Sequence, residues 1–213
     1  SDGCGEDIFL LRVGGENAVN LTESSGATDY DPAFSPDGER IAFASDREGG
    51  GIFVMGATGE SPKKISTEGA HPSWSPDGRV IAYDRMDPET GYDIWTLAMD
   101  GERQPRPFLN SLFNERSPRF SPDGRWMAYA SDETGRPEVY VQPFPGPGRK
   151  SRISTDGGTY PVWARDGREL FYWGADGASM MSVTMVSLPA LSPGRPQTLF
   201  HQRNSYPFDV GSD

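Results

Sequence analysis

One short motif returns along this chain and constrains its fold more than any other feature. Residues 34–38 read Phe-Ser-Pro-Asp-Gly, residues 74–78 Trp-Ser-Pro-Asp-Gly and residues 120–124 Phe-Ser-Pro-Asp-Gly. A weaker copy, Trp-Ala-Arg-Asp-Gly, occupies residues 163–167. The aspartates of successive copies are 40, 46 and 43 residues apart. A period of this size indicates a solenoid, a propeller or another repeat array.

The motif has the composition of a type I turn between two strands. Serine can hydrogen-bond the backbone ahead of it, proline fixes φ near −65°, and glycine supplies the positive φ that returns the chain to a strand. Short apolar runs follow each copy, at residues 41–43, 81–83, 127–129 and 170–172. The aspartates are therefore predicted to serve the turn rather than catalysis.

Each repeat contains four short strand patterns, and no stretch of ten or more residues shows helical periodicity. Four strands at this spacing are typical of a β-propeller blade, whereas a β-sandwich would predict no repetition. We predict an all-β propeller with four complete blades and partial blades at both ends, forming a single domain or arc over residues 1–213. The expected blades are 29–68, 69–112, 113–156 and 157–203, with partial blades at 1–28 and 204–213.

The partial blades leave two arrangements open. The two ends could combine into a fifth, incomplete blade, or the chain could be an arc of a larger ring. We favour the arc, because ring closure removes exposed strand edges and a composite blade would lack one strand. Open edges pair with other chains, so this fragment is expected to oligomerise or aggregate.

The repeat resembles the WD40-like propeller repeats of TolB, a bacterial periplasmic protein with a six-bladed propeller that binds partner proteins. The likeness rests on Pro-x-[Phe/Trp]-Ser-Pro-Asp-Gly followed by Ile-Ala-[Phe/Tyr], in residues 31–45, 71–84, 117–132 and 160–173. The resemblance implies a six-bladed parent, a protein or peptide partner and a periplasmic or extracytoplasmic location. The resemblance leaves open whether the propeller also binds a small-molecule ligand.

Residues 126–173 are similar to the C-terminal propeller of many bacterial serine/threonine protein kinases, which implies a kinase-associated sensor domain. The chain has no His-Arg-Asp, Asp-Phe-Gly or glycine-rich phosphate loop of a kinase. Similar repeats form the gating propeller of prolyl-oligopeptidase-like enzymes, but Gly-x-Ser-x-Gly is absent. We therefore predict a non-catalytic interaction or sensory module. The alternative is the accessory, substrate-gating propeller of such a hydrolase or of a propeller lyase.

Composition excludes several other classes. The net charge of −11 disfavours binding to a nucleic-acid backbone, which depends on Lys and Arg. No run of 18 apolar residues occurs, so no membrane span is expected in this sequence. Cys4 is the only cysteine and cannot form an internal disulfide.

Candidate binding residues come from the opening of each blade's first strand. That strand is innermost in a propeller, and its first residues approach the central channel. A ring of unlike polar groups at one channel end is where small ligands or peptide termini bind in many propellers. The alternative is that these residues only line a water-filled channel. The six candidates are Asp31, His71, Arg116, Ser117, Tyr160 and Tyr206.

No cofactor or metal site is expected. His71 and His201 are far apart in the sequence, and clustered ligands are the usual mark of a metal site. Asp29, Asp31, Asp87 and Glu89 could suggest calcium, but no Asp-x-Asp-x-Asp-Gly loop is present. A metal-dependent propeller enzyme would require His71 to converge with carboxylates in the channel.

The aromatic residues are expected to pack blade against blade. Two sets recur, one before each turn and one in the strand that follows it. They are Phe34, Trp74, Phe120 and Trp163, with Phe43, Tyr83, Tyr129 and Tyr172.

Overall fold

The computed structural model describes residues 6–23, 26–101, 103–186 and 191–202. In this part of the chain the structure is almost entirely antiparallel β-sheet, with one short 3-10 helix, Arg47–Gly49. None of the described helices is long and apolar enough to cross a membrane. The predicted all-β fold class is confirmed.

The strands form consecutive sheets along the chain. A two-stranded sheet contains β1 (Phe9–Leu11) and β2 (Ala18–Asn20). The next sheet contains β3 (Asp29–Phe34), β4 (Arg40–Ser45), β5 (Gly51–Gly56) and β6 (Lys63–Ser66). The third contains β7 (Ala70–Trp74), β8 (Val80–Asp87), β9 (Gly91–Ala98) and β10 (Arg106–Leu109).

The last two sheets have the same strand order. One contains β11 (Glu115–Phe120), β12 (Trp126–Ser131), β13 (Glu138–Pro143) and β14 (Ser151–Arg152). The other contains β15 (Gly158–Trp163), β16 (Glu169–Gly174), β17 (Ser179–Val186), β18 (Ser192–Pro193) and β19 (Gln197–His201). Both β18 and β19 pair with β17, and the two-residue β18 was too short to show a strand pattern in the sequence.

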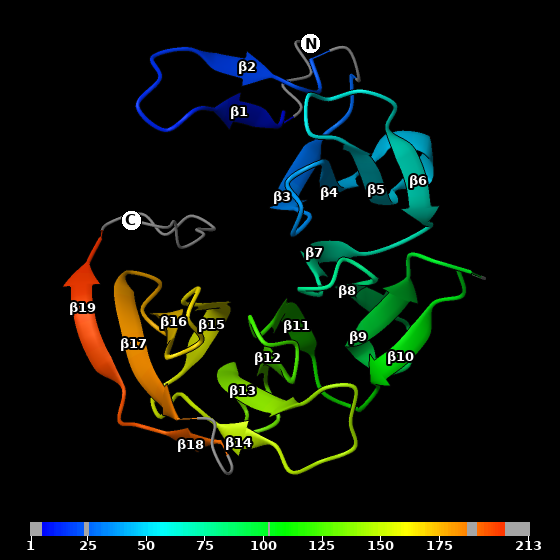
Figure 1. The fold of residues 1–213 in the computed structure, drawn as a ribbon. Coiled ribbons are helices and arrows are strands. Elements are labelled where there is room, and N and C mark those ends of the chain that lie inside the picture. Colours follow the sequence, from blue (N-terminus) through cyan, green and yellow to red (C-terminus); the bar gives the residue numbers. More distant parts are fainter. Residues whose placement is uncertain (1–5, 24–25, 102, 187–190, 203–213) are drawn as a thin grey trace.

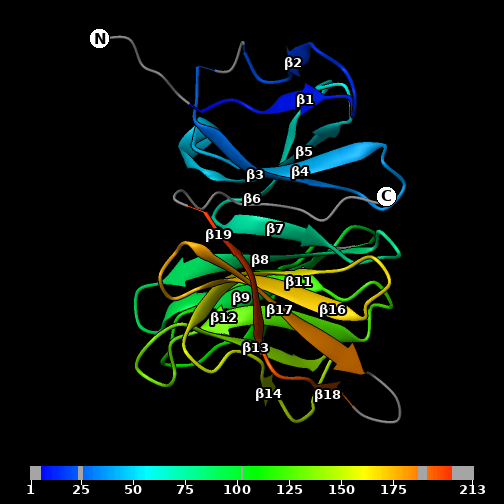
Figure 2. The same ribbon diagram turned by 90° about the vertical axis from the view of Figure 1, so that its left-hand side faces the viewer.

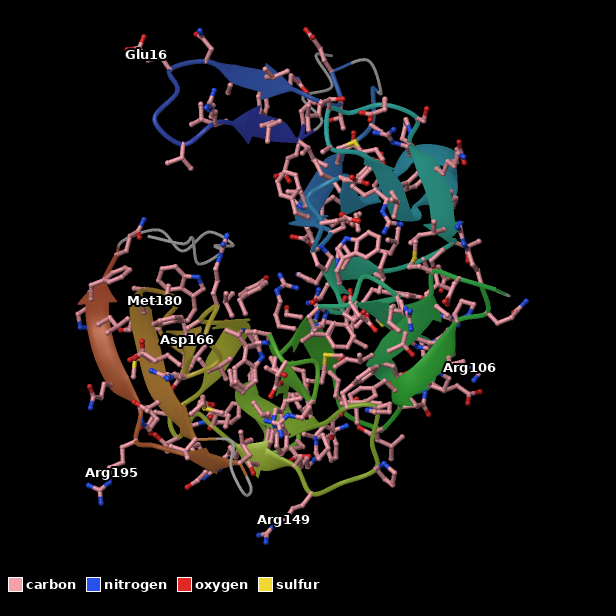
Figure 3. All side chains as sticks on the ribbon, in the orientation of Figure 1. Glu16, Arg106, Arg149, Asp166, Met180 and Arg195 are labelled. Carbon is pink, nitrogen blue, oxygen red and sulfur yellow. The ribbon has the colours of Figure 1, made fainter. Side chains whose placement is uncertain are left out.

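The sheets are arranged as an open arc. Figure 1 shows β3, β7, β11 and β15 along the inner side of this arc, and β6, β10 and β14 along its outer side. The pair β1–β2 lies at one end, and β19 forms the outer edge at the other end, on the side that faces the viewer in Figure 2. Figure 3 shows Arg106, Arg149 and Arg195 projecting outward from the rim. The inner side is therefore built by the first strand of each four-stranded unit.

The core lies between neighbouring sheets rather than within one of them. Ala42 and Ala44 of β4 form one buried cluster with Trp74, Ile81 and Tyr83 of the next sheet. Each sheet thus covers the face of its neighbour, as expected for a repeat stack in which single units cannot bury their own faces. The four aromatic residues predicted after the turns are all buried: Phe43, Tyr83, Tyr129 and Tyr172.

The aromatic residues before the turns follow the prediction in three of four cases. Trp74, Phe120 and Trp163 are buried, and the Trp74 Nε1 group donates to the carbonyl of Ala33 in the preceding inner strand at 3.1 Å. Phe34 is 52% exposed, so its predicted packing between blades is wrong in this structure. The strands described before Phe34, β1 and β2, supply no inner strand against which its ring could pack.

Candidate functional site: the inner-strand bulges

Every inner strand is interrupted by a bulge near its beginning. The residue in each bulge precedes a proline: Asp31-Pro32, His71-Pro72, Ser117-Pro118 and Tyr160-Pro161. Proline has no N–H to donate to a ladder, so it is tolerated at an edge strand or a bulge. The pairing register shifts between Tyr30 and Ala33, Ala70 and Ser73, Arg116 and Arg119, and Thr159 and Val162.

The four bulge residues share an unusual backbone conformation. Their φ angles are 53° at Asp31, 51° at His71, 55° at Ser117 and 51° at Tyr160. For residues other than glycine this left-handed region costs roughly 1–2 kcal/mol per residue. Such strain persists only where the surroundings enforce it, and it is concentrated at functional sites. We call these four residues the bulge ring.

His71 connects two sheets through carboxylates on both sides. Its Nδ1 lies 2.7 Å from Oδ2 of Asp84 in its own sheet, and its Nε2 lies 3.5 Å from Oδ2 of Asp31 in the preceding sheet. The His71 backbone N–H also donates to Asp31 Oδ2, at 3.2 Å. His71 and Asp84 are both buried, so these contacts are sheltered from water.

Asp84 continues the network into the following sheet. Its Oδ2 accepts a hydrogen bond from the Ser117 backbone N–H at 2.8 Å and lies 4.0 Å from Arg116 Nε. Its Oδ1 is buried and has no hydrogen-bond partner among the described residues. Burying a carboxylate costs free energy unless it is paired or hydrogen-bonded. The contacts with His71 and Ser117 therefore offset the cost of burying Asp84, and Asp84 in turn fixes the positions of both residues.

Sequence reasoning missed Asp84, although a signal was present. Asp84 follows the apolar run at residues 81–83, at the position that Ala44 and Ala130 occupy in the neighbouring repeats. The fourth repeat has Trp173 here, so Asp84 is the one charged residue at a position that is otherwise apolar, and a buried polar group needs partners. Comparison of the repeats with one another would have identified this residue.

Arg116 and Tyr160 bring the network to the surface. The Arg116 guanidinium lies over the Tyr92 ring, 4.0 Å from its centre, and the Tyr160 ring centre is 5.6 Å from that of His71. Arg116, Ser117 and Tyr160 line one pocket of about 140 Å³ between the third and fourth complete sheets. The side chains of Arg116 and Tyr160 are partly exposed, so an incoming group could contact both.

Glu115 opens the third inner strand beside this pocket. Burial raises the pKa of its carboxyl group to about 7, although the Ser111 hydroxyl, which donates to Oε1 at 2.6 Å, acts in the opposite direction. Its Oε2 is buried without a hydrogen-bond partner among the described residues. The third inner strand therefore begins, two residues before Ser117 of the bulge ring, with a carboxyl group that titrates near neutral pH.

The opposite end of each inner strand carries the recurring motif, and the predicted turn chemistry is present there. In the copy at residues 74–78, the Gly78 N–H donates to the Ser75 carbonyl at 2.8 Å, and the Ser75 hydroxyl donates to Asp77 Oδ1 at 2.6 Å. This hydroxyl hydrogen bond is the main reason why the pKa of Asp77 is lowered. Gly78 has a φ of 69°, as a turn of this kind requires.

The carboxylates that could have suggested a metal are already engaged. Asp29 binds the Arg47 guanidinium through both oxygens, and Asp87 accepts a hydrogen bond from the Glu89 backbone N–H at 2.9 Å. His71 does converge with Asp31 and Asp84, but its two ring nitrogens contact their carboxylates directly. Within the described residues no group of three potential ligands could hold a metal ion.

The second histidine lies apart from the bulge ring. His201 is at the outer edge in β19, where its Nδ1 lies 2.8 Å from the Ser179 hydroxyl oxygen. Tyr206, and the expected partial blade 204–213, fall outside the described residues. The structure therefore brings together five of the six predicted residues, and it adds Asp84, which contacts three of them: His71, Arg116 and Ser117.

Repeated four-stranded sheets in an arc, joined along their inner strands, define a β-propeller. The family model described as the TolB beta propeller domain matches residues 1–104 and 70–196. The chain belongs to this family.

Individual relatives agree with this assignment. A protein TolB homolog of Chlorobium luteolum is 32% identical over 139 residues, which span 64% of this chain and 31% of that protein. The solved structure of an Agrobacterium tumefaciens protein assigned as a TolB superposes with a TM-score of 0.77 at 23% identity, covering 90% of this chain and 73% of the other. The chain thus spans about a third of the length of its curated Chlorobium relative.

A more distant likeness connects the fold to peptidases. The structure of a prolyl endopeptidase superposes with a TM-score of 0.57 at 16% identity, covering 88% of this chain and 32% of the other. At this identity the likeness concerns the fold alone.

Proposed function

We propose that this chain is a non-catalytic interaction module that binds a peptide segment of a partner protein at the bulge ring. The observation that carries the proposal is the repeated, strained bulge, which has a different residue in each of four sheets and lies beside a pocket lined by the partly exposed Arg116 and Tyr160. The family supports the propeller architecture, and we further propose an extracytoplasmic bacterial location.

The chemistry of the site suits a polar segment with one anchoring side chain. The lining of the pocket beside the bulge ring includes the Arg116 guanidinium and the Tyr160 hydroxyl. Asp31 supplies a partly accessible carboxylate nearby. The pocket of about 140 Å³ is smaller than the sites of drug-sized ligands, which span roughly 300–1,000 Å³. It matches a single side chain, and Tyr and Arg are the residue types that dominate binding energy at protein interfaces.

The test is selection from a random peptide library against the purified chain, followed by affinity measurement on the selected peptides. The double variant Arg116→Ala/Tyr160→Ala is expected to bind them at least about tenfold more weakly, as expected when interface anchors are lost. The matched control is Arg106→Ala, which removes an exposed arginine from the outer strand β10. Selected peptides that bind the double variant as tightly as the wild type would contradict the proposal.

The second candidate is an accessory propeller that restricts access to a peptidase domain. The structural likeness to a prolyl endopeptidase supports this fold assignment. The two candidates differ in what is attached to the same polypeptide. Sequencing of the gene on both sides distinguishes them: a Gly-x-Ser-x-Gly hydrolase segment favours the gating role, and a kinase with a transmembrane helix favours the interaction role.

A further inference from the structure

The turns at the other end of the inner strands surround a second pocket, of about 480 Å³. It lies between residues of all four complete sheets. Its lining includes Pro36, Trp74, Pro76, Pro122, Trp163 and Arg165. A volume in this range is ordinary for a ligand site, and we call it the turn pocket.

Neighbouring turns touch one another around this pocket. A Cβ at Gly124 would lie 3.1 Å from Pro76, and one at Gly167 would lie 3.7 Å from Pro122. The proline of each turn therefore packs against the glycine of the next. In the fourth copy of the motif Arg165 stands at the proline position. The departure of this copy from the repeat thus places a cation where the other turns present an apolar ring.

Arg165 is available for an external partner. Its side chain is exposed, and it makes no hydrogen bond or ion pair with any residue that the structure describes. Arg119 supplies a second guanidinium to the same lining, while donating hydrogen bonds to backbone carbonyls of Pro118 and His71. No carboxylate belongs to the described lining of the pocket. The described lining of the turn pocket therefore carries two guanidiniums, whereas Asp123 and Asp166 line the adjoining pocket that shares Pro122 and Trp163 with it.

Apart from Ser121 and the two arginines, the residues that line the pocket are apolar. The Trp74 and Trp163 indole N–H groups already donate to backbone carbonyls, at 3.1 and 3.3 Å, so their rings offer only nonpolar contact. Two guanidiniums beside tryptophan and proline rings are complementary to a chain that carries carboxylates between apolar groups. We propose that the turn pocket binds an acidic peptide segment of a partner protein, with Arg165 pairing with a carboxylate of that segment.

The experiment uses a fluorescein-labelled peptide of alternating aspartate and proline and measures fluorescence anisotropy with the purified chain. The acidic peptide is expected to bind, with an affinity that falls as salt is raised, and the same peptide with lysine for aspartate is expected not to bind. Arg165→Ala should weaken binding by about tenfold or more, because a charge-assisted hydrogen bond is lost.

Two further variants keep the outcome decisive. Arg168→Ala removes a neighbouring arginine that is 83% exposed and does not line the pocket, so it should leave binding unchanged. Arg165→Pro restores the residue of the other three turns and should fold normally while binding weakly. Equal binding of the lysine peptide, wild-type affinity in both Arg165 variants, or an equal loss in Arg168→Ala would each overturn the proposal.

Discussion

The two ends of the inner strands differ in where their polar groups find partners. At residues 75–79 the side-chain hydrogen bonds of the turn are internal, because the Ser75 hydroxyl and the Arg79 backbone N–H both donate to Asp77 Oδ1. At the bulge ring the partners come from other sheets: the His71 N–H donates to Asp31 and the Ser117 N–H to Asp84. One end is satisfied locally and the other depends on its neighbours.

This difference explains which residues repeat. A turn with internal hydrogen bonds needs no particular polar partner in the neighbouring sheet, so nearly the same five residues can serve in every unit. A bulge that depends on the next sheet requires a particular pair of side chains at each junction, and its residues differ from unit to unit. The uniform positions build the fold, and the variable positions carry the candidate sites.

The largest expected contrast is between two aspartates of the same sheet. Asp84→Ala removes a buried carboxylate that holds His71 and the Ser117 N–H, and breaking a buried pair costs roughly 3–5 kcal/mol. Asp77→Ala removes hydrogen bonds at the surface, worth about 1 kcal/mol. Urea unfolding of both variants measures the difference. Equal losses would show that the bulge ring is no more interdependent than the turn.

A smaller contrast separates two copies of the turn itself. Gly38 and Gly124 have φ angles of 72° and 69°, so alanine is strained at both, by about 1 kcal/mol. A Cβ at Gly124 would also lie 3.1 Å from Pro76. A Cβ at Gly38 would have no described atom within 4 Å, apart from those of the adjacent residues in the chain. We expect Gly124→Ala to cost about 2 kcal/mol in thermal unfolding, because crowding adds to the strain. Equal melting temperatures of the Gly38→Ala and Gly124→Ala variants would mean that the turns do not pack against one another.

Titration should distinguish the two ends by the sign of the pH effect. Burial raises the pKa of Glu115 from 4.5 to about 7, so its contribution to stability is present below about pH 4.5 and is lost as the pH rises through 7. Hydrogen bonds from Ser35 and Ser75 lower the pKa of Asp37 and Asp77, whose contributions are present above pH 3.8 and are lost as the pH falls further.

The measurement is the melting temperature of the wild type and Glu115→Gln across this range. The variant should become progressively more stable than the wild type as the pH rises from about 5 to about 8. Parallel curves would show that Glu115 does not titrate in the folded protein as its burial requires.

The fold was accessible from the sequence because turn and strand signals are local and repeat four times. The bulge ring was located for the same reason, since each of its residues stands at a fixed distance before a motif. Asp84 could not be placed by spacing alone, because its importance lies in contacts with His71 and Ser117 across the sheets. The exposure of Phe34 was equally hidden, because burial of that ring depends on a preceding inner strand.

The most direct test of the account is Tyr160→Gly, with stability and peptide binding measured on the same sample. Glycine relieves a strain of roughly 1–2 kcal/mol at the φ of 51°, which offsets the lost ring contact with His71 and the greater freedom of the unfolded chain. The account predicts an unfolding free energy within about 1 kcal/mol of the wild type and at least about tenfold weaker binding of the library-selected peptides. A marked loss of stability with unchanged binding would contradict it, because Tyr160 would then serve the fold rather than the site.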